Sequence, residues 1–185
     1  MRKVASLVAA LAFCTNAFGA IVTFNPGGVV DVPVGTPSVT VDVTVSGQTL
    51  TDIQGVDLVL GSNEQAFTFE YSAAAGAAFT TLAPPSAFGL FPNDLVVGGN
   101  RLAGTVPANL LLGSATFDTS GLADGTSFTL QVNPDIDLGL SNLLNAGQQE
   151  GFTASSVTFR IVPEPATLAL LGLGALGLIR RRRTA

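Results

Sequence analysis

Carboxylates are the residues in this sequence that could carry out acid–base or metal chemistry. The chain has no histidine, its one cysteine is Cys14 and its one lysine is Lys3. These absences exclude histidine-based triads and zinc sites of the His/Cys type. They also exclude cysteine nucleophiles and lysine Schiff bases, because Cys14 and Lys3 lie in an N-terminal stretch that we expect to be removed.

Two carboxylates at a suitable spacing could hydrolyse a glycosidic bond. Asp57, Glu70 and Asp118 stand at polar positions of runs in which apolar and polar residues alternate. A solvated acidic face of a sheet accounts for all three, and no motif selects a pair from them. The sequence therefore predicts a protein that is not an enzyme and has no catalytic residues.

One short stretch could bind calcium. Asn133, Asp135 and Asp137 place oxygen ligands at every second position. An EF-hand loop that began at Asn133 would need glycine at its sixth position and glutamate at its twelfth, where Leu138 and Leu144 stand. We expect no cofactor and no metal site, and keep this stretch as a weak calcium candidate. The alternative interpretation is a solvated strand end followed by a turn.

The aromatic residues are almost all phenylalanines: twelve, with one tyrosine and no tryptophan. Phe79, Phe88 and Phe91 lie in a turn-rich stretch, residues 73–93, that we expect to be a long loop. This loop is the candidate contact surface, and covering the core is its alternative role. The other assigned phenylalanines are expected in the core, on the apolar faces of strands: Phe67, Phe69, Phe117, Phe128 and Phe159.

The charge of the central part excludes some partners. Between residues 20 and 162 only two basic residues, Arg101 and Arg160, stand against twelve acids, a net charge of −10. Binding of this part to nucleic acid or to an anionic membrane surface is disfavoured by electrostatic repulsion.

The N-terminus has the order of regions of a secretory signal peptide. Arg2 and Lys3 precede the apolar run 4–13, which small residues at Ala17 and Gly19 follow. The apolar run is too short for an uncleaved membrane anchor. We expect removal of the first nineteen residues, with cleavage after Ala17 as the alternative.

The C-terminus consists of a proline motif, an apolar run and a basic cluster. As a helix, the uncharged run 166–179 would rise about 21 Å against a hydrocarbon core of about 30 Å. Basic residues after such a run match the cytoplasmic flank of a stop-transfer segment. The motif is Val162, Pro163, Glu164 and Pro165, and the basic residues are Arg180, Arg181, Arg182 and Arg183.

This tail resembles the PEP-CTERM sorting domain of Gram-negative bacteria, also catalogued as the ice-binding protein C-terminal domain. The resemblance implies recognition by an exosortase, a membrane-embedded protease that processes proteins near the Pro-Glu-Pro triplet. It also implies transient residence in the inner membrane and association with exopolysaccharide and biofilm-matrix systems. An ordinary single-span anchor with a proline-containing linker is the alternative.

Strands with one apolar face must position whatever site the middle of the chain carries. Alternation with period two predicts half-buried strands with these apolar positions: 39, 41, 43 and 45; 56, 58 and 60; 67, 69 and 71; 128, 130 and 132; 157, 159 and 161. We expect further strands at 101–106 and 110–118, and turns at residues 25–28, 46–47, 92–94, 98–100 and 123–125. Such short strands predict two antiparallel sheets packed face to face as a β-sandwich.

Residues 38–161 also resemble the cohesin-type jelly-roll superfamily, which includes carbohydrate-binding modules. The stretches that carry the resemblance are 38–46, 55–60, 111–118 and 125–132. The family's tyrosine-aspartate-proline turn is absent after Leu60, where Gly61, Ser62 and Asn63 stand. The resemblance therefore implies the fold, and no partner-binding residues are carried over.

Together these features predict three parts: a signal peptide (1–19), an all-β jelly-roll sandwich (20–161) and a sorting signal (162–185) with one short transmembrane helix (166–179) and a basic tail (180–185). We expect an exported protein of the cell surface or extracellular matrix, with an exosortase as partner and no nucleic acid. Its expected role is structural or adhesive in the exopolysaccharide layer. The alternative is a carbohydrate-binding module.

Overall fold

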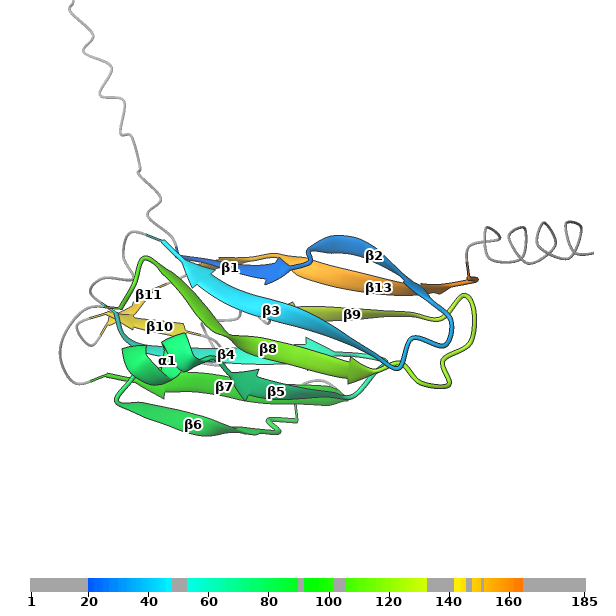
Figure 1. Ribbon diagram of the computed structural model, residues 1–185. Helices are drawn as coiled ribbons and strands as arrows, with labels where there is room; N and C mark the ends of the chain where they lie inside the picture. The colour runs from blue at the N-terminus through cyan, green and yellow to red at the C-terminus, as the bar shows by residue number, and fades with distance from the viewer. Residues whose placement is uncertain are drawn as a thin grey trace, which may run out of the picture.

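The computed structural model describes residues 20–47, 53–89, 92–101, 106–132, 142–145, 148–150 and 152–164. These residues form a β-sandwich of two facing sheets, which confirms the predicted all-β architecture (Figure 1). The predicted transmembrane segment 166–179 lies outside the described residues. Within them, no helix is long and apolar enough to cross a membrane.

Two sheets account for all the described strands. Sheet A has five strands in the order β12 (Phe152–Ala154), β1 (Ala20–Asn25), β3 (Ser38–Ser46), β8 (Asn109–Asp118) and β5 (Phe67–Tyr71). Sheet B has eight: β11 (Gln148–Glu150), β10 (Asn142–Asn145), β4 (Ile53–Ser62), β9 (Ser127–Val132), β13 (Ser156–Val162) and β2 (Gly28–Pro33), with β7 (Asn93–Asn100) paired to β4 and β6 (Thr81–Ser86) paired to β7.

The sheets are mixed, which corrects the expectation of purely antiparallel pairing. β1 runs parallel to β12, and β2 runs parallel to β13. The reason is that the chain leaves sheet A at Asn25 and enters sheet B at Gly28, so consecutive N-terminal strands pair with late strands in different sheets. The predicted turn at residues 25–28 is the point of this crossing.

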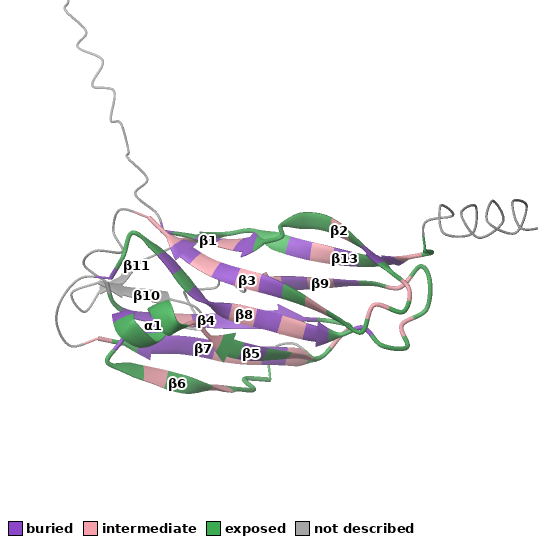
Figure 2. Ribbon diagram, in the orientation of Figure 1, coloured by how far each residue is buried: buried purple, intermediate pink, exposed green. Residues whose placement is uncertain are grey.

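The core lies between the sheets and contains the predicted apolar faces. Figure 2 shows buried and more exposed residues alternating along β3, β8 and β13. Phe117 of sheet A packs against Phe128 and Phe159 of sheet B, with ring centroids 4.9 and 5.8 Å apart, and none of the three is more than 1% exposed. The core assignment of these phenylalanines is confirmed.

The stretch 73–93 is largely regular structure, so the expectation of a long loop there is wrong. An alanine-rich run forms the short helix α1 (Ala73–Ala78), and the Ser72 hydroxyl accepts a hydrogen bond from the Ala75 N–H as its N-cap. The strand β6 follows. Its Pro84 and Pro85 are compatible with this position because β6 pairs on one side only, with β7.

Two other boundaries also differ from expectation. Residues 98–100 were expected to turn, yet Gly98 and Gly99 lie inside β7. These two glycines allow neighbouring atoms to pack closely against the backbone of β7. A Cβ at Gly98, for example, would lie 2.1 Å from the Val56 carbonyl oxygen. The expected strand at 101–106 is not found in its described residues, because β7 ends at Asn100 and Arg101 and Val106 lie outside strands.

Hydrogen bonds of the Tyr71 side chain connect sheet A to sheet B. The Tyr71 hydroxyl, from the edge of sheet A, accepts a hydrogen bond from the Gly98 N–H at 2.6 Å. It donates to one of two carbonyl oxygens, that of Ala83 at 2.8 Å or that of Gly98 at 3.0 Å. The β6–β7 register shifts between Ala83 and Ser86, where Pro84 and Pro85 provide no N–H donor. The hydroxyl therefore fills a gap in the ladder of sheet B.

Burial raises the pKa of Tyr71 above its ordinary value of 10.0; the hydrogen bond from Gly98 opposes this rise and the Asp57 carboxylate adds to it. We expect Tyr71→Phe to reduce the free energy of unfolding by about 1–3 kcal/mol, because the buried Gly98 N–H loses its acceptor and a neighbouring carbonyl oxygen loses its donor. Urea denaturation at neutral pH measures this cost. An unchanged urea midpoint would show that the hydroxyl does not join the sheets.

The same hydroxyl gives a pH dependence. Since the folded pKa is raised, the contribution of Tyr71 to stability is complete below about pH 10 and is lost as the pH rises through the folded value. The chain has one tyrosine and no tryptophan, so tyrosinate absorbance reports Tyr71 alone. We expect its transition to move to lower pH when the protein is unfolded in urea.

Candidate binding groove and sorting segment

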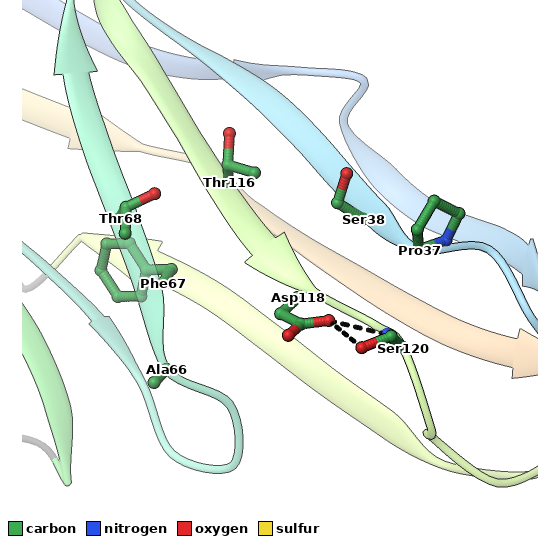
Figure 3. Close-up of a pocket in the computed structure, with 8 residues that line it drawn as sticks. All are labelled: Pro37, Ser38, Ala66, Phe67, Thr68, Thr116, Asp118 and Ser120. Atoms are coloured by element: carbon green, nitrogen blue, oxygen red, sulfur yellow. Dashed lines mark hydrogen bonds between the residues drawn. The ribbon is translucent and has the colours of Figure 1, made fainter.

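An open groove lies on sheet A where β3, β5 and β8 run side by side. It has a volume of about 550 Å³. Figure 3 shows Ser38, Thr68 and Thr116 on these three strands, with Asp118 and Ser120 where β8 ends. The complete lining is Pro37, Ser38, Ala66, Phe67, Thr68, Thr116, Asp118 and Ser120. The groove thus combines hydroxyl groups and one carboxylate with apolar walls.

Strand register explains why these polar residues come together. Thr116 of β8 lies opposite Thr40 of β3 on one side and Thr68 of β5 on the other, and Asp118 lies opposite Ser38. The hydroxyl oxygens of Thr40 and Thr116 are 3.0 Å apart, a hydrogen bond. Side chains of paired residues share a face of the sheet, so the three threonines form a row across three strands.

Asp118 is held as a hydrogen-bond acceptor. Its Oδ1 accepts from the Ser120 hydroxyl at 2.6 Å and from the Ser120 N–H at 2.8 Å. These two bonds, the hydroxyl first, lower the pKa of Asp118 below its ordinary value of 3.8. Asp118 is therefore ionised at neutral pH and offers acceptor oxygens to a ligand in the groove.

The predicted contact phenylalanines separate in the structure. Phe79 is only 5% exposed and packs into the core, because Gly99 leaves room for its ring: a Cβ there would lie 2.8 Å from Phe79 Cγ. Phe79 therefore cannot belong to a contact surface. Phe88 is 51% exposed, and Phe91 lies outside the described residues.

A buried carboxylate positions the loop that carries Phe88. Asp94 accepts hydrogen bonds from the N–H groups of Phe88 at 2.8 Å and Gly89 at 3.0 Å. Beside this loop is a second hollow of about 290 Å³, which Gly89 and Asp94 help to line. It shares Ala66 and Phe67 with the groove, so the two hollows adjoin.

The other candidate residues do not form a site in the described part of the chain. Asp57 lies on sheet B, where burial raises its pKa, whereas Glu70 and Asp118 lie on sheet A. Glu70 is paired with Ser114, four residues from Asp118 along β8 or about 13 Å at the rise of a strand. No three acidic side chains gather as a metal site among the described residues. The calcium candidates Asn133, Asp135 and Asp137 lie outside them.

The proline motif begins at the last residue of the fold. Val162 ends β13, and its carbonyl oxygen accepts a hydrogen bond from the Val34 N–H at 2.9 Å. Pro163 and Glu164 follow and are exposed. A protein-family model matches the chain from Val162 onwards. Residues 162–183 are a PEP-CTERM protein-sorting motif. The PEP-CTERM motif implies exosortase processing, export, and a cell-surface or extracellular location.

The motif's remaining parts lie outside the described residues: Pro165, Arg180, Arg181, Arg182, Arg183 and the expected membrane segment 166–179. So do the expected signal peptide, residues 1–19, and its Cys14. The division into signal peptide, sandwich and sorting signal stays a prediction.

Solved structures similar to this chain are cohesin modules. The sixth cohesin of Acetivibrio cellulolyticus scaffoldin B has a TM-score of 0.58 at 13% identity, covering 77% of this chain and 99% of that one. A non-cellulosomal cohesin from the archaeon Archaeoglobus fulgidus gives 0.54 at 16%, covering 82% and 96%. A type III cohesin from a cell-surface anchoring scaffoldin of Ruminococcus flavefaciens gives 0.59 at 10%, covering 78% and 88%. The cohesin-like jelly-roll fold is thereby confirmed.

The comparison with curated proteins found no match. Neither the sorting motif nor a cohesin-like fold is catalytic in type.

Sequence reasoning missed the groove itself. It placed Asp118 correctly on an outward face and Phe67 among the core residues, where it does pack against Phe117 at a centroid distance of 5.2 Å. It assigned no role to Ser38, Thr68 or Thr116. Their polar positions in alternating strands were visible, but the order of the strands in the sheet was not.

We expect Ser120→Ala to raise the pKa of Asp118 part of the way to its ordinary value, because one of two hydrogen bonds to the carboxylate is lost. Since the folded pKa is lowered, the stabilising contribution of Asp118 is present above about pH 3.8 and is lost as the pH falls through the folded value. In the variant this loss begins at higher pH. NMR titration of the Asp118 side chain measures the change.

Ser114→Ala is the matched control. It removes a hydroxyl that donates to Asp42 at 2.7 Å and should leave the Asp118 titration as it was. Equal Asp118 pKa values in the parent protein and in Ser120→Ala would contradict the assignment.

Proposed function

We propose that this chain is an exported, non-catalytic surface protein whose β-sandwich holds neutral polysaccharide of the extracellular layer in the groove on sheet A. Residues 1–19 direct export, and an exosortase cuts the chain at the sorting motif and removes the tail. The domain then has a structural or adhesive role in the exopolysaccharide matrix. The observation that carries the proposal is the groove on a chain with a surface-sorting motif.

The chemistry of the groove favours a sugar chain. Ligand sites are commonly concave and apolar, with a few polar groups that fix orientation. Phe67, Pro37 and Ala66 give the apolar walls, while the hydroxyls of Thr68 and Thr116 and the Asp118 carboxylate can pair with sugar hydroxyls. The net charge of −10 between residues 20 and 162 opposes polyanions, which favours a neutral polymer.

A protein partner is the second candidate. The support is the fold, because one similar cohesin was solved in complex with the Cel5 dockerin. The observation that ranks it below the sugar is the mixed polar lining of the groove.

Replacing two groove threonines should weaken sugar binding without unfolding the domain. We expect Thr68→Val with Thr116→Val to lower affinity for neutral polysaccharide isolated from the cell surface by about tenfold or more, since two polar partners are lost. Affinity gel electrophoresis measures the effect.

The matched control is Thr129→Val with Thr158→Val. These residues face each other across two strands of sheet B, as Thr68 and Thr116 do on sheet A, and their hydroxyl oxygens are 2.9 Å apart. Equal affinities of the two double variants would remove the groove from the proposal. Binding of the parent chain to surface proteins but not to polysaccharide would favour the second candidate.

Phe88 offers a further contact beside the groove. We expect Phe88→Ser to reduce retention of the protein in the cell-surface fraction while changing the free energy of unfolding by no more than about 0.5 kcal/mol, because the side chain is exposed. Val29→Ser, at a residue 68% exposed on β2, is the control for loss of an exposed apolar side chain. Equal retention of both variants would exclude Phe88 from the contact surface.

A further inference from the structure

We infer that the folded sheet limits which peptide bond the sorting protease can cut, so that the bonds accessible in the folded protein lie on the C-terminal side of Val162. This inference rests on the proposed function, because it takes sorting by an exosortase as given. It concerns this chain's own geometry: the matched motif starts at residue 162, and the sheet ends at the same residue.

The first residue of the motif is a structural part of sheet B. In the parallel ladder between β13 and β2, Val162 is paired with Pro33. The carbonyl oxygen of Val162 accepts from the Val34 N–H at 2.9 Å. Its side chain is half-buried. Val162 therefore belongs to both the sheet and the motif.

The preceding residue is held more firmly. Ile161 is 1% exposed, and its side chain packs in the core. Its N–H donates to the Thr126 carbonyl at 2.8 Å, and its own carbonyl accepts from the Gly125 N–H at 3.0 Å. Releasing Ile161 would break both hydrogen bonds and expose an apolar side chain to water.

One way in which an extended peptide binds another protein is to pair its free main-chain groups with a strand of that protein. β13 has no free side for this, since it pairs with β9 on one side and β2 on the other. Pro163 has no N–H, so the first main-chain donor after the sheet belongs to Glu164, which is exposed. Pro163 and Glu164 are therefore the first residues that the protease can bind, and they follow the folded domain without a linker.

The sheet selects the bond and does not take part in the reaction. One C–N bond breaks, the acyl carbon passes to water or to an acceptor amine, and the tail leaves as an amine that takes up a proton. Cutting before Val162 would first require β13 to separate from the sheet. The domain opens in this way only rarely, so the peptide bonds before Val162 are accessible in only a small fraction of the folded molecules.

The test lengthens the junction in the full chain. Three Gly-Ser repeats are inserted between Val162 and Pro163, and pulse-chase labelling in the exporting host follows removal of the tail. We expect several-fold faster removal, because the domain no longer crowds the motif. The control has the same insert between the exposed residues Asn63 and Glu64 and should process at the parent rate. Equal rates for both inserts would overturn the inference.

The C-terminal residue of the surface form gives a second readout. Mass spectrometry of the processed parent chain should find a product that retains Val162. A product that ends at Ile161 or earlier would overturn the inference.

Hydrogen exchange of the purified, unprocessed chain separates the role of the sheet in limiting cleavage from the proposal that an exosortase sorts the chain. We expect the N–H groups of Val34 and Ile161 to exchange far more slowly than that of Glu164. If the N–H groups of Val34 and Ile161 exchange as fast as that of Glu164 while the tail is removed normally, the role of the sheet is overturned and the sorting proposal is not. Retention of the tail in every variant would overturn the sorting proposal, and the inference with it.

Discussion

The contact of Phe117 with Phe128 and Phe159 joins the two sheets, and the rest of the structure depends on it. Because successive residues of a strand point to opposite faces, burying Phe117 turns its neighbours Thr116 and Asp118 outwards into the groove. In the same way, Phe159 and Ile161 point inwards and help to hold β13 in register with β2 up to its last residue, Val162. One buried cluster thus positions both the groove and the start of the sorting motif.

Alternation of apolar residues predicted five strands correctly, because these strands have one face in the core: β3, β4, β5, β9 and β13. β3 is the clearest example, with Val41, Val43 and Val45 fully buried between polar neighbours. The sorting motif could also be identified from the sequence, since its parts are contiguous. By contrast, the groove depends on the order β3-β8-β5, and strand order is set by long-range pairing that no local pattern encodes.

The errors arose where residues with strong local preferences serve a tertiary role. Gly98 and Gly99 are typical of turns, yet here they lie in β7 because backbone and ring atoms leave no room for a Cβ. Phe79 was assigned to a surface because its stretch is rich in small residues and prolines. That stretch contains α1 and β6 instead, and Phe79 closes the core beneath them. In each case, packing overrode the preference of the residue.

The segment between β2 and β3 connects the groove with the start of the sorting motif. Val34 holds Val162 at the start of the sorting motif. Two and three residues later, Thr36 and Pro37 accept hydrogen bonds from the Thr119 hydroxyl at 2.5 Å and the Thr119 N–H at 3.0 Å, next to Asp118 and Ser120. Figure 1 shows β13 and β8 ending, and β3 beginning, at the same end of the sandwich. The end of the groove formed by Pro37, Asp118 and Ser120 and the start of the sorting motif therefore lie at the same end of the sandwich, positioned by one short connecting segment.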